Sequence, residues 1–128
     1  METWWLHVLD IFFVVFHSAL IVFILFGWIF PKTRMAHLVV ALLTGGSWFI
    51  LGLFYGMGFC PLTEWHWQVL REMGKTGLPV SYVQYILDRL TGISISPAFA
   101  DQITFLGWLI PTTISVILTI RKFFSVSR

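Results

Sequence analysis

Three ionisable side chains share one face of an apolar segment near the N-terminus. His7, Asp10 and His17 fall within an arc of about 80° on a helix, so they predict a single polar stripe. Ionisable groups inside lipid are costly and are therefore functional candidates. Asp10 is expected about one turn below the outer headgroups, and His17 near the bilayer middle. One hypothesis is a proton or small-solute pathway in which Asp10 exchanges protons with outer water and His17 relays them inward.

A third histidine, His66, offers a different chemistry. It stands between Trp65 and Trp67 on the apolar face of a predicted short helix. Two neutral imidazoles facing one plane ligate haem b, so His66 with His7 or His17 would form an outer-side redox site for haem b or a quinone. The alternative is structural, with His66 anchored at the interface beside two Trp rings.

His17 has a structural alternative as well. Pro111, inside the third apolar segment, lacks an amide donor and frees the carbonyl of Gly107, which predicts a kink near mid-membrane. His17 would donate a hydrogen bond to that carbonyl or to a Thr hydroxyl. His37, at the opposite membrane level, is interpreted as a headgroup contact.

Cys60 is the single cysteine, and it precedes Pro61 in a predicted turn. One thiol excludes an internal disulfide framework, and the chain has no paired Cys or HxxxH spacing, so no metal site is predicted. We interpret Cys60 as a small, half-buried turn residue. No nucleophile and base pair and no phosphate loop are present to indicate catalytic residues, which argues against an enzyme.

The amino-acid composition indicates that these side chains lie in a membrane protein. Of 128 residues, 58% are hydrophobic and 11% charged, which is too few charges for a soluble domain. The sequence predicts an all-α integral membrane protein in which two short amphipathic surface helices separate the second and third transmembrane helices. We expect a single membrane domain, 1–128, with crossings at about 5–30, 37–59 and 98–120 and an outer-face helical loop at 60–96.

Glycines predict how the second crossing packs. Gly45, Gly52 and Gly56 lie with Ala41 on one narrow stripe, a spacing that lets helix backbones touch. If the first two crossings form a regular antiparallel hairpin, Asp10 lies opposite Tyr55 and Gly56.

Basic residues in short segments predict orientation. Lys32 and Arg34 occupy the first turn, Arg121, Lys122 and Arg128 the tail, and none precedes the first crossing. The pattern predicts an outer N-terminus and a cytoplasmic C-terminus in a bacterial inner membrane. Eight basic against six acidic residues exclude a nucleic-acid partner.

Several motifs carry a resemblance that spans almost the whole chain. They are Asp10 and His17, Trp28-x-x-Pro31, His37, and Cys60-Pro61-Leu62-Thr63 after a glycine-punctuated helix. With them the chain resembles the bacterial membrane proteins grouped as domain of unknown function 2784, in a Bacteroidetes-type branch. The resemblance implies the same topology and names no reaction.

The function that these observations favour is an accessory, structural or assembly subunit of a larger membrane complex. Three helices rich in glycine and aromatic residues bury little among themselves, which leaves surface for other membrane subunits as well as for the lipid bilayer.

Overall fold

A computed structural model describes residues 4–56 and 58–126. Residues 1–3, 57, 127 and 128 are not described, so the charges of Glu2 and Arg128 lie outside this account. All regular structure in the described ranges is helical. The elements are α1 (Trp4–Phe26), α2 (Pro31–Gly46), the π-helix η1 (Ser47–Leu51), α3 (Gly52–Tyr55), α4 (Pro61–Glu72), α5 (Tyr82–Thr91) and α6 (Pro97–Val126). The predicted fold class is confirmed.

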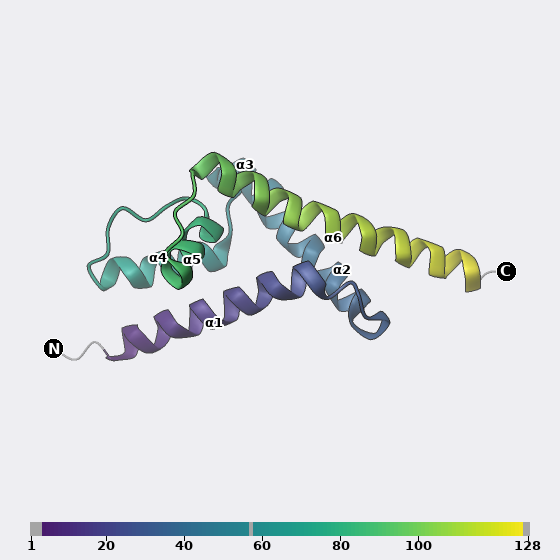
Figure 1. Cartoon of the computed structure of the whole chain (residues 1–128), viewed down its shortest axis with the longest axis horizontal. Helices are drawn as coiled ribbons and strands as arrows, with labels where there is room; N and C mark the ends of the chain where they lie inside the picture. Colours follow the sequence, from purple (N-terminus) through teal and green to yellow (C-terminus); the bar gives the residue numbers. More distant parts are fainter. Residues whose placement is uncertain (1–3, 57, 127–128) are drawn as a thin grey trace.

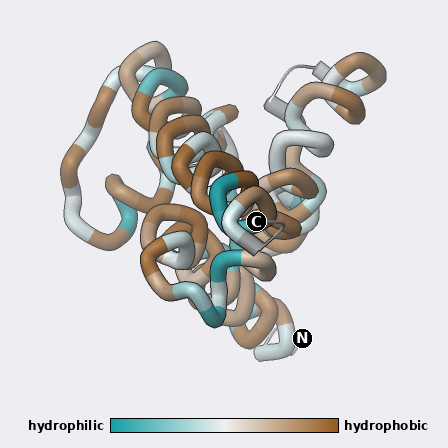
Figure 2. Tube along the Cα trace, turned by 90° about the vertical axis from the view of Figure 1, so that its right-hand side faces the viewer, coloured by the Kyte–Doolittle hydropathy of each residue, from teal (hydrophilic) through white to brown (hydrophobic). Residues whose placement is uncertain are grey.

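Three helical stretches are long and apolar enough to cross a membrane: Trp4–Phe26, Pro31–Tyr55, which joins α2, η1 and α3, and Pro97–Ser125. Hydrophobic residues dominate along them (Figure 2). The two ends of the described chain lie at opposite ends of the molecule, and α4 and α5 sit beside the N-terminal half of α1 (Figure 1). The chain therefore has the build of a membrane protein with three crossings.

Side chains of the first two turns of α2 close the C-terminal end of α1. The last carbonyls of a helix lack amide partners, and in lipid they must find others. His37 Nε2 donates to Ile24 O at 2.7 Å, Thr33 Oγ1 to Gly27 O at 2.7 Å, and Arg34 Nε to Trp28 O at 3.1 Å. His37 is 0% exposed, so its interpretation as a headgroup contact was wrong: the imidazole satisfies a backbone carbonyl instead.

α2 packs against α6 through small residues. A Cβ added at Gly45 would lie 2.5 Å from Cζ2 of Trp108, so only glycine fits there. Trp108 Nε1 donates to Ala41 O at 2.8 Å. Gly52 is buried. Gly56 differs from the expectation, because it ends α3 with φ +112° and nothing lies within 4 Å of a Cβ built there.

The helix boundaries follow local signals. Ser81 Oγ accepts from Gln84 N at 3.3 Å, and Ser96 Oγ accepts from Phe99 N at 3.1 Å, so these two serines are the N-caps of α5 and α6. Gly92 ends α5 in the left-handed conformation at φ 77°. Ser81 and Gly92 therefore define the ends of α5, which carries three residues of the polar site, Tyr82, Tyr85 and Arg89.

Pro111 is buried, and α6 continues through it as one helix. A Cβ added at Gly107 would lie 3.3 Å from Leu25, so the carbonyl region of Gly107 is level with the C-terminal end of α1. His17 lies two turns earlier on α1. The expected hydrogen bond from His17 to the Gly107 carbonyl is therefore absent.

Candidate functional site

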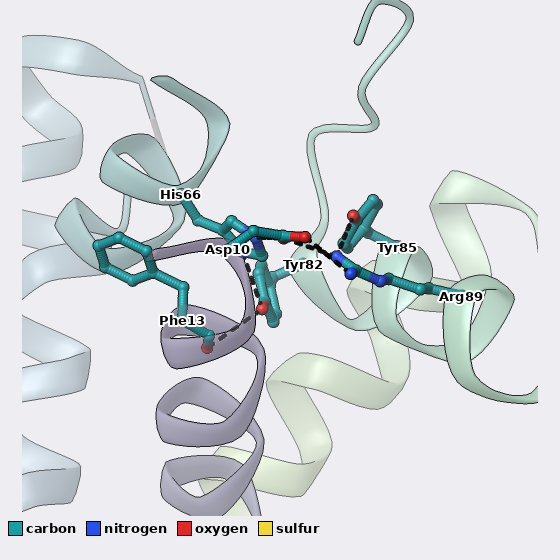
Figure 3. Close-up of polar contacts among 6 residues, drawn as sticks. All are labelled: Asp10, Phe13, His66, Tyr82, Tyr85 and Arg89. Atoms are coloured by element: carbon teal, nitrogen blue, oxygen red, sulfur yellow. Dashed lines mark hydrogen bonds and ion pairs between the residues drawn. The ribbon is translucent and has the colours of Figure 1, made fainter. Parts of the chain in front are cut away.

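A buried carboxylate on α1 is the centre of the polar site. Asp10 is 5% exposed. Arg89 of α5 donates from Nη1 to Oδ1 at 2.7 Å and from Nη2 to Oδ2 at 2.8 Å, which is the two-pronged geometry typical of a strong Arg–carboxylate pair. His66 of α4 reaches Oδ1 through Nε2 at 2.7 Å (Figure 3). Three helices thus meet at one side chain.

His66 has partners on both ring nitrogens. It is 0% exposed, and its Nδ1 lies 3.0 Å from the hydroxyl of Tyr82. An ionised Asp10 accepts only, so Nε2 carries the hydrogen, and neutral His66 then accepts at Nδ1 from Tyr82. The Tyr82 hydroxyl also lies 3.5 Å from Phe13 O, and its single hydrogen can serve one acceptor at a time. The shorter distance favours His66.

The protonation states of the side chains in this site depend on burial and on the Asp10–Arg89 pair. Burial lowers the pKa of His66, while its hydrogen bond to Asp10 acts in the opposite direction. Burial also raises the pKa of Tyr82. The hydrogen bond to Asp10 raises the pKa of Arg89. The neutral forms of His66 and Tyr82 and the charged form of Arg89 are therefore favoured, in agreement with the hydrogen-bond directions.

Aromatic rings enclose these polar atoms. Trp67, Leu70 and Tyr82 form a buried cluster, and Trp67 stacks on Tyr82 with ring centroids 5.4 Å apart. Trp67 Nε1 donates to Pro79 O at 3.0 Å, which fixes the loop before α5. Sequence periodicity put Trp65 on the inward face, but Trp65 is 53% exposed and Trp67 is buried in its place.

His17 lies beside this cluster without joining its hydrogen bonds. Its ring stacks on Tyr82 with centroids 3.8 Å apart and planes 13° apart. It is 7% exposed, and its Nδ1 has no hydrogen-bond partner among the described residues. Tyr82 thus lies between the two histidines, hydrogen-bonded to His66 and stacked on His17.

The other predicted site residues lie apart. His7 is exposed. Tyr55 is 69% exposed and stacks on Phe59, so it does not face Asp10. Cys60 is a half-buried free thiol directly before α4, in agreement with its interpretation as a turn residue. Asp10 does not lie opposite Tyr55, because the chain inserts α4 and α5 beside α1 at that level.

Sequence reasoning missed Arg89, Tyr82 and Tyr85. Arg89 pairs with Asp10 across 79 positions and also donates to the Tyr85 hydroxyl at 2.9 Å. The available signal was charge balance: a carboxylate on an apolar helix needs a cation, and the loop at the same membrane level supplies Arg71, Lys75 and Arg89.

The arrangement acts as a clamp between α1 and the two amphipathic helices. Both Asp10 oxygens and both His66 nitrogens have protein partners. Within the described residues, no three His, Cys, Asp or Glu side chains are grouped to hold a metal ion. The hydrogen bonds of the clamp hold a charged group stably in an apolar environment.

Comparison with known proteins identifies a family. The model of a family described as Protein of Unknown function (DUF2784) matches residues 7–120. No curated protein and no solved structure matches the chain. The match confirms the resemblance drawn from Asp10, His17 and the Cys60 motif, and the Bacteroidetes-type branch stays a prediction.

Proposed function

We propose that the chain, which belongs to the Protein of Unknown function (DUF2784) family, is a small accessory or assembly subunit of a larger membrane complex. The supporting observation is the surface of its long helices. In the most apolar 18-residue stretch of each, 17% of the residues are buried inside the chain. Helices that bury so little among themselves offer broad apolar faces to neighbouring subunits.

The clamp supports a structural role. Asp10, His66 and Arg89 direct their polar atoms at one another, and Asp10 and His66 are almost fully enclosed. Such a group fixes α4 and α5 against α1. It holds the outward faces of the helices in a defined arrangement, as a subunit interface requires.

The same contacts make the alternatives less favourable. For His66 to ligate a haem iron, Nε2 would have to leave Asp10 or Nδ1 would have to leave Tyr82. A proton pathway starting at Asp10 would have to release the carboxylate from two Arg89 hydrogen bonds. Each step breaks hydrogen bonds in a buried site, and those to Asp10 are charge-assisted.

The proposal includes a location. We place the protein in a bacterial cytoplasmic membrane with its N-terminus outside and its C-terminus in the cytoplasm. The support is the basic turn at Lys32 and Arg34 and the basic end of α6 at Arg121 and Lys122.

Photo-crosslinking tests the proposed subunit role. A diazirine analogue of leucine replaces Leu42 or Leu53, which are 56% and 77% exposed, in the full chain in its native membrane. Both positions should give a covalent adduct with the same second membrane protein. The control is Leu70, which is 2% exposed and should give none. Adducts with lipid alone from both exposed positions contradict the proposal.

A further inference from the structure

A cavity of about 700 Å³ lies between the long helices and the two amphipathic helices, on the far side of Tyr82 from His66. This volume is in the range of sites for small organic ligands. The cavity opens on the molecular surface and is lined mainly by apolar side chains from α1, α2, η1, α4, α5 and α6. Six of the lining residues carry aromatic rings: Phe16, His17, Trp48, Phe49, Tyr82 and Phe105.

One polar group in the wall has an unmet hydrogen bond. His17 lines the cavity, is 93% buried by its 7% exposure, and its Nδ1 has no partner among the described residues. Buried polar atoms are almost always hydrogen-bonded, so an unpartnered imidazole nitrogen indicates that a ligand supplies the missing hydrogen bond. Stacking on Tyr82 holds the ring in place without occupying either nitrogen.

A second irregularity lies in the cavity lining. The π-helix Ser47–Leu51 interrupts the second membrane helix, and Ser47, Trp48 and Phe49 from it line the cavity. π-helical turns inside α-helices are frequent at functional sites. Here the π-helix and the unpartnered His17 belong to the same cavity.

The charge of the lining restricts the ligand. The described lining residues include no Lys or Arg, and one carboxylate, Asp101. A phosphate headgroup or a haem propionate would meet no cation there. A plain acyl chain would leave His17 without its hydrogen bond. A flat, uncharged ring with a carbonyl oxygen needs no cation and satisfies His17. The aromatic side chains of the cavity stack on the ring, and the imidazole N–H donates to the carbonyl oxygen.

We propose that this cavity binds the head group of an isoprenoid quinone, with His17 donating to one quinone carbonyl and the aromatic walls enclosing the ring. The proposal concerns binding and goes beyond the subunit role, which does not depend on it. A quinone reaches the cavity from the bilayer, where its apolar tail remains.

Binding is tested with decylubiquinone added to the purified full-length protein in detergent micelles. Trp48 lines the cavity, so quinone binding should quench part of the tryptophan fluorescence. We expect saturable quenching. His17→Phe keeps an aromatic ring at this position but removes the two nitrogens, and it should weaken quinone binding about tenfold, equivalent to about 1.4 kcal/mol. His7→Phe, an exposed histidine on the same helix, is the matched control and should bind as the natural protein does.

Two further arms make the test decisive. Thr44→Phe places a phenyl ring in the cavity without adding a tryptophan, so it should weaken saturable quenching, and it provides the test if His17→Phe does not fold. Farnesol, an isoprenoid alcohol without a ring, should not displace the quinone at equal concentration. Quenching that matches protein-free partitioning into micelles, unchanged affinity in both His17→Phe and Thr44→Phe, or equal displacement by farnesol would each overturn the proposal.

Discussion

Replacing Arg89 with glutamine should be among the most destabilising single changes in the polar site. The change removes both hydrogen bonds that the guanidinium donates to Asp10, at 2.7 and 2.8 Å. Asp10, at 5% exposure, cannot turn to water. The carboxyl group is then left in an apolar setting with His66 as its remaining partner.

The magnitude follows from burial. Removing one partner of a buried ion pair costs about 3–5 kcal/mol. The Arg89 side chain is 30% exposed and His66 still donates to Oδ1, so we expect the lower end, about 3 kcal/mol. Asp10→Asn removes the charge but keeps an acceptor for His66, and it should cost about 1–2 kcal/mol.

The assay is reversible unfolding in mixed detergent micelles, followed by circular dichroism. The double variant Asp10→Asn with Arg89→Gln should be more stable than the sum of the single losses predicts, by about 1 kcal/mol or more. The control is Arg71→Gln. Arg71 pairs with Glu64 at 3.0 Å, but the side chains are 51% and 39% exposed, so its loss should cost less than about 1 kcal/mol. Equal effects of Arg89→Gln and Arg71→Gln would refute the buried clamp.

Three other perturbations have defined outcomes. Burial lowers the folded-state pKa of His66, so the unfolded chain binds more protons than the folded chain below pH 6.5. The contribution of His66 to stability should therefore fall on acidification, by at most about 1.4 kcal/mol per pH unit. In detergent unfolding from pH 7 to 5, the free energy of unfolding should depend less steeply on pH in His66→Phe than in the natural protein. Gly45→Ala forces a methyl against Trp108 and should cost about 1–3 kcal/mol in the same assay, whereas Gly46→Ala, with its nearest atom at 4.0 Å, should be tolerated; equal stability of the two variants would contradict the close approach. Ser81→Ala removes the N-cap of α5 and should lower stability by about 1 kcal/mol, and an unchanged unfolding midpoint would show that the cap contributes nothing.

Features that depend on local chemistry were predictable from sequence. Ser81 and Ser96 are of a residue type that favours N-caps and they cap α5 and α6, Gly92 ends α5, and the apolar stretches form the long helices. Each of these depends on a few neighbouring residues, and lipid leaves the backbone of an apolar segment little choice besides a helix.

Partners distant in sequence were not predictable. A regular hairpin would pair Asp10 with Tyr55, but the second crossing packs on α6 through Gly45, and α4 and α5 occupy the space beside α1. Asp10 then meets His66 and Arg89, 56 and 79 positions away. No local sequence pattern predicts contacts between residues so far apart in the sequence.

The roles of the histidines differed from the sequence-based expectations because they too depend on partners distant in sequence. Sequence indicates that His37 stands at a helix start, but not that the last turn of α1 leaves the Ile24 carbonyl within its reach. The stacking of His17 on Tyr82 likewise depends on where α5 docks. Of the polar stripe on α1, Asp10 and His17 are buried and His7 is exposed, and the partners of the buried residues required the tertiary structure.

The proposed subunit role is tested most directly by the mass of the native particle. The protein is extracted from its own membrane in a mild detergent or in lipid nanodiscs, and its mass and polypeptide composition are measured by native mass spectrometry. The proposal predicts a particle well above the 14.8 kDa of one chain that contains at least one other membrane polypeptide. A particle made only of this chain, under conditions that keep other complexes of the same membrane intact, would contradict it.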